Sequence, residues 1–180
     1  MKDTLKYQDI LVAVLLLFFI STTEAQTANQ QEIITDAEAA RQTLIQQDSH
    51  MQTLFENSVG YVIFPNVGKG AYVVGGASGN GAVYQNGQLI GMADLKQLDV
   101  GLQLGGQAFI QVMFFGNEQA MNEFKQGGFK LAGNASAVAL DKGAADNINF
   151  KDGVAVVTLP KAGAMIEVSV GGQKFDFEAF

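Results

Sequence analysis

The apolar residues before Gly60 recur at helical spacing. They follow one another at steps of three, four or seven: Ile33, Ala37, Ala40, Leu44, Met51 and Phe55. Such spacing places side chains on one face of a helix. Thr35 and Glu38 form a possible capping box, so the pattern predicts a helix from about Thr35 to Asn57. Its polar face is acidic, whereas helices at membrane surfaces usually carry Lys and Arg there, so we expect the stripe to pack in a core.

From Gly60 onward the apolar period changes to two, which is typical of strands. The alternating runs predict strands over 59–64, 71–77, 81–85, 88–92, 100–115, 129–131, 135–140, 154–159, 164–170 and 173–177. The run 59–64 is expected to end at Pro65, which favours an extended residue before it. Asn86-Gly87 predicts a tight hairpin turn, because a type I′ turn needs positive φ at both central positions. Residues 117–126 predict one short helix, and residues 141–152 a polar loop.

The longest extended run, 100–115, has two different faces. Gln103, Gln107 and Gln111 fall on one face, while the other is apolar, which predicts one packed and one mixed face. All 21 glycines lie between Gly60 and Gly172. Glycine inside a strand favours bends and bulges. The predicted fold is therefore α+β, with an N-terminal amphipathic helix packed on a curved, mostly antiparallel, glycine-rich sheet or partial barrel, plus one short helix.

The first 25 residues have the features of a secretory signal. Residues 10–20 are eleven consecutive apolar residues, fewer than the roughly 20 that a membrane-spanning helix needs. Lys2 and Lys6 precede them, and the small residues Thr23 and Ala25 follow as in a cleavage site. We predict a signal peptide over 1–25, with an uncleaved anchor or a buried helix as alternatives. The exported product then has a helical segment, 26–57, and a β-rich body, 58–180, in one domain, located in the periplasm or cell envelope.

Composition and charge exclude several classes of function. The chain has no Cys and a single His, which excludes disulfide scaffolds, Cys-zinc sites, iron–sulfur clusters and His-rich metal sites. The 18 acidic residues outnumber the 11 basic ones and give a net charge of −7. Nucleic-acid binding depends on Lys and Arg that neutralise phosphates, so we expect no nucleic-acid partner.

The motifs that could carry chemistry favour structural interpretations. The glycines of 75–81 resemble a phosphate loop, but strand-like residues follow where a helix is needed, so a hairpin turn is expected. His50 stands beside Asp48 and Ser49, and neighbours on one helical turn point in different directions, so no triad is predicted. The acids of 141–152 lack the pattern of a calcium loop. We therefore expect neither an enzyme nor a metal or cofactor site. Lys69, between two glycines, is expected in a turn, as an anion contact or as a solvated side chain.

An ordered series of glycine-containing segments carries a resemblance to a known family. The segments are Gly60–Gly70 (GYVIFPNVGKG), Val74–Val83 (VGGASGNGAV), Val100–Gln107 (VGLQLGGQ), Phe124–Leu131 (FKQGGFKL) and Asn134–Val138 (NASAV). In this order and behind a signal peptide, residues 51–177 resemble the SYLF lipid-binding domain family, in its exported bacterial branch. The resemblance implies a non-enzymatic domain that binds lipid or a membrane surface.

The resemblance also suggests lipid-contacting residues. Lys69 matches a cationic position of the family, and Gln103 and Gln107 match its GxQxG segment, so these three are the candidate lipid-binding residues. The glutamines have a structural alternative, as polar groups on a strand face that bond to neighbouring backbone. Eukaryotic relatives bind phosphoinositides partly through a basic segment, whereas this N-terminal helix carries only Arg41 among acids. The resemblance therefore implies lipid binding without headgroup specificity.

Other classes of function remain open at this point. The first is an exported structural or protein-interaction module of the cell envelope, with an envelope protein as partner and no lipid ligand. The second is a small outer-membrane β-barrel, although counting back by twos from Phe180 places charged residues on the lipid face. A hydrolase is a further alternative, for which no nucleophile–base pair stands out.

Overall fold

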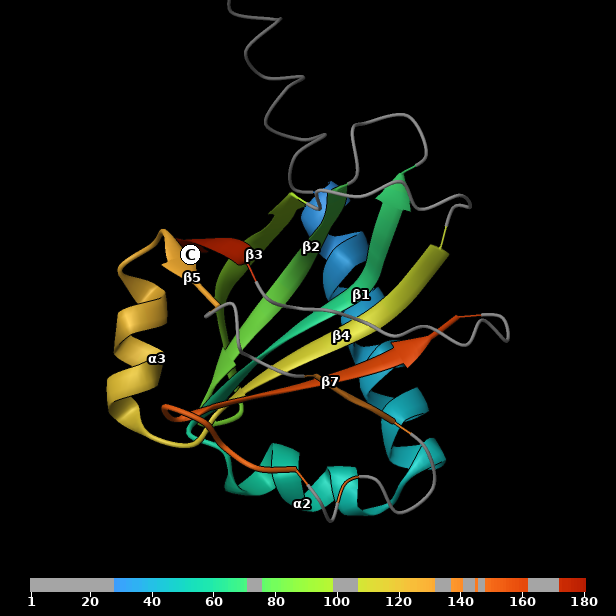
Figure 1. Ribbon diagram of the computed structural model, residues 1–180, viewed down its shortest axis with the longest axis vertical. Coiled ribbons are helices and arrows are strands. Elements are labelled where there is room, and N and C mark those ends of the chain that lie inside the picture. Colours follow the sequence, from blue (N-terminus) through green and yellow to red (C-terminus); the bar gives the residue numbers. More distant parts are fainter. Residues whose placement is uncertain are drawn as a thin grey trace, which may run out of the picture. The chain divides into compact units, whose positions relative to one another are not determined.

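A computed structural model describes residues 28–70, 76–98, 107–131, 137–140, 145, 148–161 and 172–180. The chain divides into two compact units, Met1–Glu32 and Ile33–Phe180, and the fold described below is that of the second. The predicted signal peptide, residues 1–25, lies outside the described residues. The fold is α+β, as predicted, and its described residues form three helices and one curled sheet of eight strands (Figure 1).

The predicted N-terminal helix is present, but as two helices. One helix covers residues 28–47, and α2 covers His50–Asn57. The first helix already begins at residue 28, so Thr35 is not its N-cap. The helix breaks at Asp48 because this side chain accepts a hydrogen bond from the backbone N–H of His50 (3.0 Å). Local side-chain bonds of this kind compete with helical continuation, which explains why one long helix was the wrong prediction.

The predicted short helix is confirmed as α3, Glu118–Lys125. Asn117 is its N-cap, and its side chain accepts a hydrogen bond from the N–H of Ala120 (2.9 Å). Glu118 in the first turn and Lys125 in the last turn complement the helix dipole. The sequence therefore contains the start and stop signals of this helix.

The eight strands form a single sheet in the order β5-β8-β3-β2-β1-β4-β7-β6 (Figure 1). The strands are β1 (Gly60–Gly70), β2 (Gly76–Gln85), β3 (Gln88–Leu98), β4 (Gln107–Phe115), β5 (Phe129–Lys130), β6 (Ala137–Ala139), β7 (Val154–Pro160) and β8 (Gln173–Ala179). The predicted strand over 164–170 and the first part of the run 100–115 lie outside the described residues. The turn at Asn86-Gly87 is confirmed, with φ values of 52° and 75° between β2 and β3.

The sheet is mixed, which corrects the prediction of a mostly antiparallel one. β6 runs parallel to β7, while the other pairs of neighbouring strands are antiparallel. A parallel pair needs a crossover connection of about a dozen residues or more, and residues 140–153 connect these two strands. The sequence shows this segment only as a polar loop, and nothing in its pattern reveals the direction in which the chain returns.

Strand β1 continues through Pro65, where a strand end was predicted. The register against β4 shifts between Phe64 and Val67, and the register against β2 shifts between Ile63 and Gly68. Proline has no N–H for a ladder hydrogen bond, so it is tolerated at such an irregularity. The predicted turn around Lys69 is therefore wrong, and this residue belongs to a strand that pairs on both sides.

The glycine-rich segment before Val83 is a strand rather than the predicted hairpin turn. It forms the first half of β2, where the backbones of β1 and β2 approach closely. A Cβ atom on Gly81 would lie 2.6 Å from the carbonyl oxygen of Ile63 and 2.7 Å from Cδ1 of Phe64. Glycine is required here because no side chain fits between the two strands.

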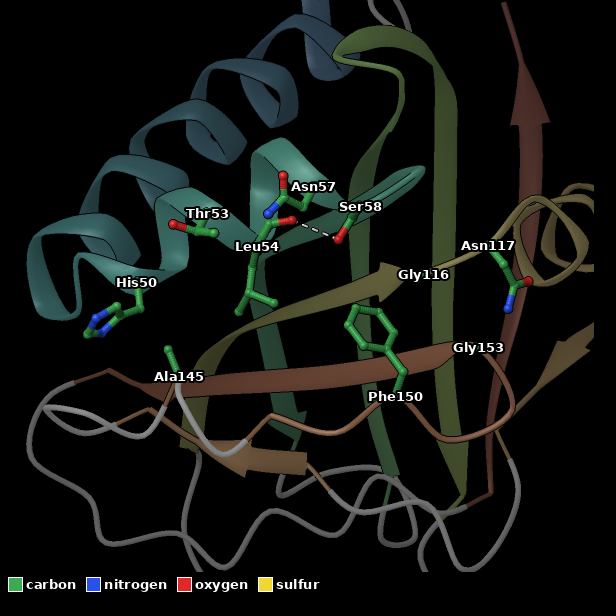
Figure 2. A pocket seen from close by; sticks show the side chains of 10 residues that line it. All are labelled: His50, Thr53, Leu54, Asn57, Ser58, Gly116, Asn117, Ala145, Phe150 and Gly153. Atoms are coloured by element: carbon green, nitrogen blue, oxygen red, sulfur yellow. Dashed lines mark hydrogen bonds between the residues drawn. The ribbon is translucent and has the colours of Figure 1, made fainter.

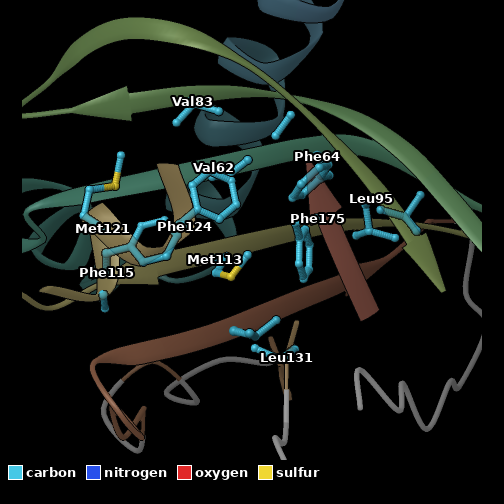
Figure 3. Packing of buried hydrophobic residues seen from close by; sticks show 14 of the residues in the cluster. Val62, Phe64, Val83, Leu95, Met113, Phe115, Met121, Phe124, Leu131 and Phe175 are labelled. Atoms are coloured by element: carbon cyan, nitrogen blue, oxygen red, sulfur yellow. The ribbon is translucent and has the colours of Figure 1, made fainter. Parts of the chain in front are cut away.

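The sheet is packed on both faces. Residues 61–64 of β1 are all at most 5% exposed, and they alternate between two hydrophobic clusters. One cluster contains the apolar side chains of α3, and Figure 3 shows Phe64 and Phe175 facing each other within it (centroids 5.7 Å apart). The other contains five of the six predicted stripe residues, which confirms that this stripe packs in the core: Ala37, Ala40, Leu44, Met51 and Phe55.

Replacement of Gly81 by alanine is expected to destabilise the fold through backbone crowding. The added Cβ forces β1 and β2 apart, and overpacking of this kind costs about 1–3 kcal/mol. The matched control is Gly68→Ala, because a Cβ on Gly68 meets nothing within 4 Å. Denaturant unfolding should show a lower free energy of unfolding for Gly81→Ala only. Equal losses in both variants would contradict the close-approach explanation.

Candidate functional site

Two of the three predicted lipid-binding residues lie opposite each other in the sheet. Lys69 in β1 and Gln107 in β4 are cross-strand partners, and Lys69 also pairs with Ala77 of β2. Residues directly opposite on neighbouring strands occupy the same face of a sheet. Gln103 lies outside the described residues. The structure thus brings together two positions that were selected from separate segments of the sequence.

A network of buried glutamines lies on the same face of the sheet as α3. The alternation along β4 places position 107 on the same face as Phe109 and Gln111, both fully buried. Gln111 donates a hydrogen bond to Gln173 (2.8 Å), which donates in return to Gln111 (3.1 Å) and also to Gln97 (3.0 Å). The expectation of one packed and one mixed face for β4 is therefore wrong, since this face is packed as well.

Hydrogen bonds between side chains connect the three amides. Each comes from a different strand: Gln97 from β3, Gln111 from β4 and Gln173 from β8. The structural alternative of backbone bonding concerned Gln103 and Gln107, and it stays a prediction. Thr158 of β7, the cross-strand partner of Gln111, is fully buried, and its hydroxyl oxygen has no hydrogen-bond partner among the described residues. This part of the sheet interior is therefore polar, while the part near Phe115, Met121 and Phe124 is apolar.

A pocket of about 670 Å³ lies beside α2 (Figure 2). Its lining comes from α2 and the following Ser58, from the turn between β4 and α3, and from the chain before β7. Ten residues line it: His50, Thr53, Leu54, Asn57, Ser58, Gly116, Asn117, Ala145, Phe150 and Gly153. Phe150 is 41% exposed although it is a large apolar side chain. The volume falls within the range of about 300–1,000 Å³ that is usual for small-molecule sites.

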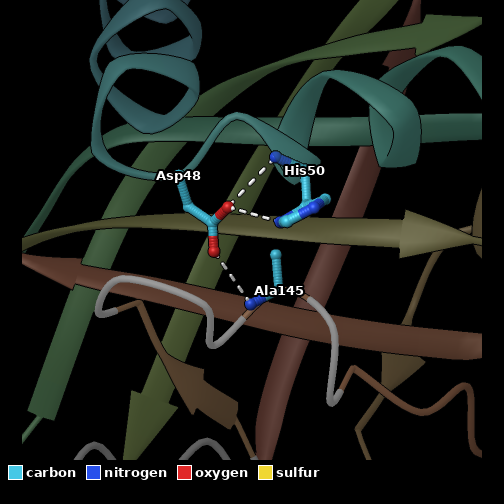
Figure 4. A network of polar contacts seen from close by, with 3 residues as sticks. All are labelled: Asp48, His50 and Ala145. Atoms are coloured by element: carbon cyan, nitrogen blue, oxygen red, sulfur yellow. Dashed lines mark hydrogen bonds and ion pairs between the residues drawn. The ribbon is translucent and has the colours of Figure 1, made fainter.

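A buried carboxylate holds one side of this pocket in place (Figure 4). Asp48 Oδ1 accepts hydrogen bonds from the backbone N–H of His50 (3.0 Å) and from its Nδ1 (3.1 Å). Asp48 Oδ2 accepts one from the N–H of Ala145 (3.1 Å). Burial by itself raises the pKa of Asp48, but the bonds from His50 and Ala145 outweigh it, so its pKa lies below the usual value. An ionised Asp48 therefore links the helix break to the distant segment at 145.

The pocket has no arrangement for nucleophilic catalysis among the described residues. A serine nucleophile needs a hydrogen bond to a base such as histidine. The hydroxyl of Ser58 instead donates to the carbonyl oxygen of Leu54 (2.7 Å), at the end of α2. His50 is held by Asp48 through Nδ1, which fixes the orientation of its ring.

No cluster of three or more His, Cys, Asp or Glu side chains among the described residues could hold a metal ion. Within the same residues, no helix combines the length and the apolar character needed to cross a membrane. The apolar run 10–20 lies outside them.

Comparison with known proteins does not identify the chain. No family model matches the sequence, and no curated protein matches it either. The resemblance to SYLF domains therefore stays a prediction.

Sequence reasoning missed the pocket and most of its residues. His50 was singled out, but only as an exposed side chain on a continuous helix. Phe150 is an apolar residue within a polar loop, and such an isolated aromatic was the one available signal. The other lining residues are small or polar, and only the tertiary structure brings them together.

Asp48→Asn is expected to lower the free energy of unfolding by about 1.5–3 kcal/mol at pH 7, the value of hydrogen bonds to a charged group. The pKa of Asp48 is lowered in the fold, so its contribution is complete above the unfolded value of about 3.9. It is lost as the pH falls through the folded value. Denaturant titrations between about pH 2 and 7 should therefore show the difference from the parent protein shrinking in acid.

The control for this experiment is Asp36→Asn, an exposed acid on the preceding helix. This variant should change the free energy of unfolding little at any pH. A loss in Asp48→Asn that stays constant down to the lowest pH would contradict the stabilisation by an ionised carboxylate.

Proposed function

We propose that this chain is an exported, non-enzymatic protein that binds lipid or a membrane surface, as its resemblance to SYLF domains implies. The observation that carries the proposal is the register of β1 and β4, which pairs Lys69 with Gln107. Both residues were selected for lipid contact from segments far apart in the sequence. Their pairing places the two positions opposite each other on neighbouring strands, which supports the proposal.

The surroundings of this pair limit where a lipid can bind. Position 107 shares its strand face with Gln111, which belongs to the glutamine network. Gln111, Phe115 and Phe124 are fully buried and therefore offer no surface to a lipid. The proposal accordingly assigns lipid contact to the end of β1 and β4 where Lys69 and Gln107 pair.

Charge limits the kind of lipid binding that is expected. The chain carries a net charge of −7, so anionic membranes repel it as a whole. Lys69 alone offsets little of this repulsion. Binding therefore depends on apolar and hydrogen-bonding contacts, with weak dependence on lipid charge and on salt.

Liposome flotation of residues 26–180 tests the proposal, with neutral and anionic vesicles at low and physiological salt. We expect flotation with both vesicle types and little effect of salt. Lys69→Glu should weaken binding by about threefold, the size of effect expected of one charge contact. Lys151→Glu, at an exposed position in the loop before β7, introduces the same change of charge and should bind like the parent protein.

Three results would count against the proposal. No flotation under any condition removes the membrane-surface function and favours an envelope structural or protein-interaction module. A steep loss of binding with added salt contradicts apolar engagement. Equal weakening by Lys69→Glu and Lys151→Glu shows that total charge, and not the site, determines binding.

A further inference from the structure

We propose that the pocket beside α2 is a second binding site, which takes a neutral, polyhydroxylated group of the size of one or two sugar residues. The site is separate from the Lys69–Gln107 pair, since the pocket lining includes neither residue. It therefore goes beyond the proposed membrane binding. Three features of the pocket carry the inference: its hydrogen-bonding groups, its lack of full charges and its exposed aromatic ring.

The first feature is a set of neutral groups that can both donate and accept hydrogen bonds. Thr53 and Ser58 contribute hydroxyls, while Asn57 and Asn117 contribute carboxamides. The hydroxyl of Ser58 already donates to Leu54, so it serves a ligand as an acceptor. The oxygen of Asn117 caps α3, so this residue serves a ligand through its NH2 group. A carboxamide offers one acceptor and two donors, which matches the combined donor and acceptor character of a sugar hydroxyl. Figure 2 shows these side chains arranged around the pocket. A ligand with several hydroxyls can bond to more than one of them at once.

The second feature is the absence of full charges on the described lining. None of the ten lining residues has a carboxylate, ammonium or guanidinium group, and His50 is the single titratable side chain. Phosphates and carboxylates are usually bound by Arg or Lys. The described lining has neither, so a neutral ligand suits it better than an anionic one.

The third feature is the ring of Phe150, which is 41% exposed and contacts the backbone at Gly116. A Cβ atom on Gly116 would lie 2.8 Å from Cδ1 of the ring, so glycine is what allows this contact. The exposed part of the ring gives an apolar surface beside the polar groups. Sugars have apolar C–H faces and polar hydroxyl edges, so a ring beside amides and hydroxyls complements both parts of them.

The position of the pocket is fixed before any ligand binds. Asn117 is held by its bond to the N–H of Ala120, and Ala145 is held by Asp48. Pre-organised groups lose less conformational entropy on binding. The hydrogen-bonding groups of the pocket are thus placed by the fold and not by the ligand.

The same chemistry has two sources, a free saccharide or the sugar headgroup of a neutral glycolipid. Protein recovered after expression of the full 180-residue chain is first titrated by calorimetry with methyl β-glucoside, lactose and N,N′-diacetylchitobiose. Glucose 6-phosphate serves as the anionic comparison. In a second arm, the same protein is floated with phosphatidylcholine vesicles that either contain or lack a galactolipid.

We expect a neutral sugar to bind in at least one arm and glucose 6-phosphate to bind more weakly. Phe150→Ala should reduce the affinity about tenfold or more, as loss of an aromatic anchor does. Asn57→Ala, at an exposed position of α2, tests the hydrogen-bonding groups and should weaken binding without unfolding the chain. The matched control is Phe180→Ala, which removes another exposed aromatic (66% exposed) and should leave the affinity unchanged.

The outcomes distinguish a free saccharide from a glycolipid headgroup, and binding in the pocket from binding at the Lys69–Gln107 pair. If a free sugar binds, the natural ligand of the pocket is a saccharide. If only vesicles that contain galactolipid increase flotation, the ligand is the headgroup of a glycolipid. Phe150→Ala should abolish that gain and leave flotation on plain phosphatidylcholine unchanged, whereas Lys69→Glu should act on the plain vesicles. The proposal is overturned if no neutral sugar binds in either arm, if Phe150→Ala and Asn57→Ala bind like the parent protein, or if the phosphate ester binds best.

Discussion

The structure depends on a central strand that is buried on both of its faces. Residues 61–64 of β1 alternate between the two hydrophobic clusters, and none of them is more than 5% exposed. Such a strand needs cover on each side. The helix over 28–47 and α2 contribute side chains to one cluster, while α3 and β8 contribute to the other. The glycines of β2 follow from the same constraint, because Gly81 lets the neighbouring strand pass close to Phe64.

The helices that cover one face of the sheet also help to form the pocket. The helical segment breaks at Asp48, and both parts still place apolar residues in the same cluster, as Leu44 and Phe55 show. The carboxylate that stabilises the break also holds Ala145, so the helix junction and the chain before β7 are tied together. Four residues of α2 line the pocket: His50, Thr53, Leu54 and Asn57. Core packing and the geometry of the pocket are thus consequences of one helix break.

Much of the fold could be predicted from local patterns, and the rest depends on contacts distant in sequence. The stripe from Ala37 to Phe55, the Asn86-Gly87 turn and the helix after Asn117 each have a signal within a few residues. The helix break has a local cause in the bond between Asp48 and His50, but Asp48 also bonds to Ala145, far along the chain, and the local pattern does not reveal that contact. Likewise, no local pattern shows the direction in which the chain returns to pair β7 with β6. For the site, sequence resemblance selected Lys69 and Gln107, but the pocket consists of ordinary residues that only the tertiary structure assembles.

The central claim is that the Lys69–Gln107 end of the sheet meets the lipid, and residue-resolved NMR tests it most directly. Assigned backbone amides can be followed while the protein is mixed with phosphatidylcholine nanodiscs that contain a spin-labelled lipid. The account predicts the strongest signal broadening at and around Lys69, Ala77 and Gln107. Broadening confined to α3 would contradict the account, as would unchanged spectra at saturating nanodisc concentration.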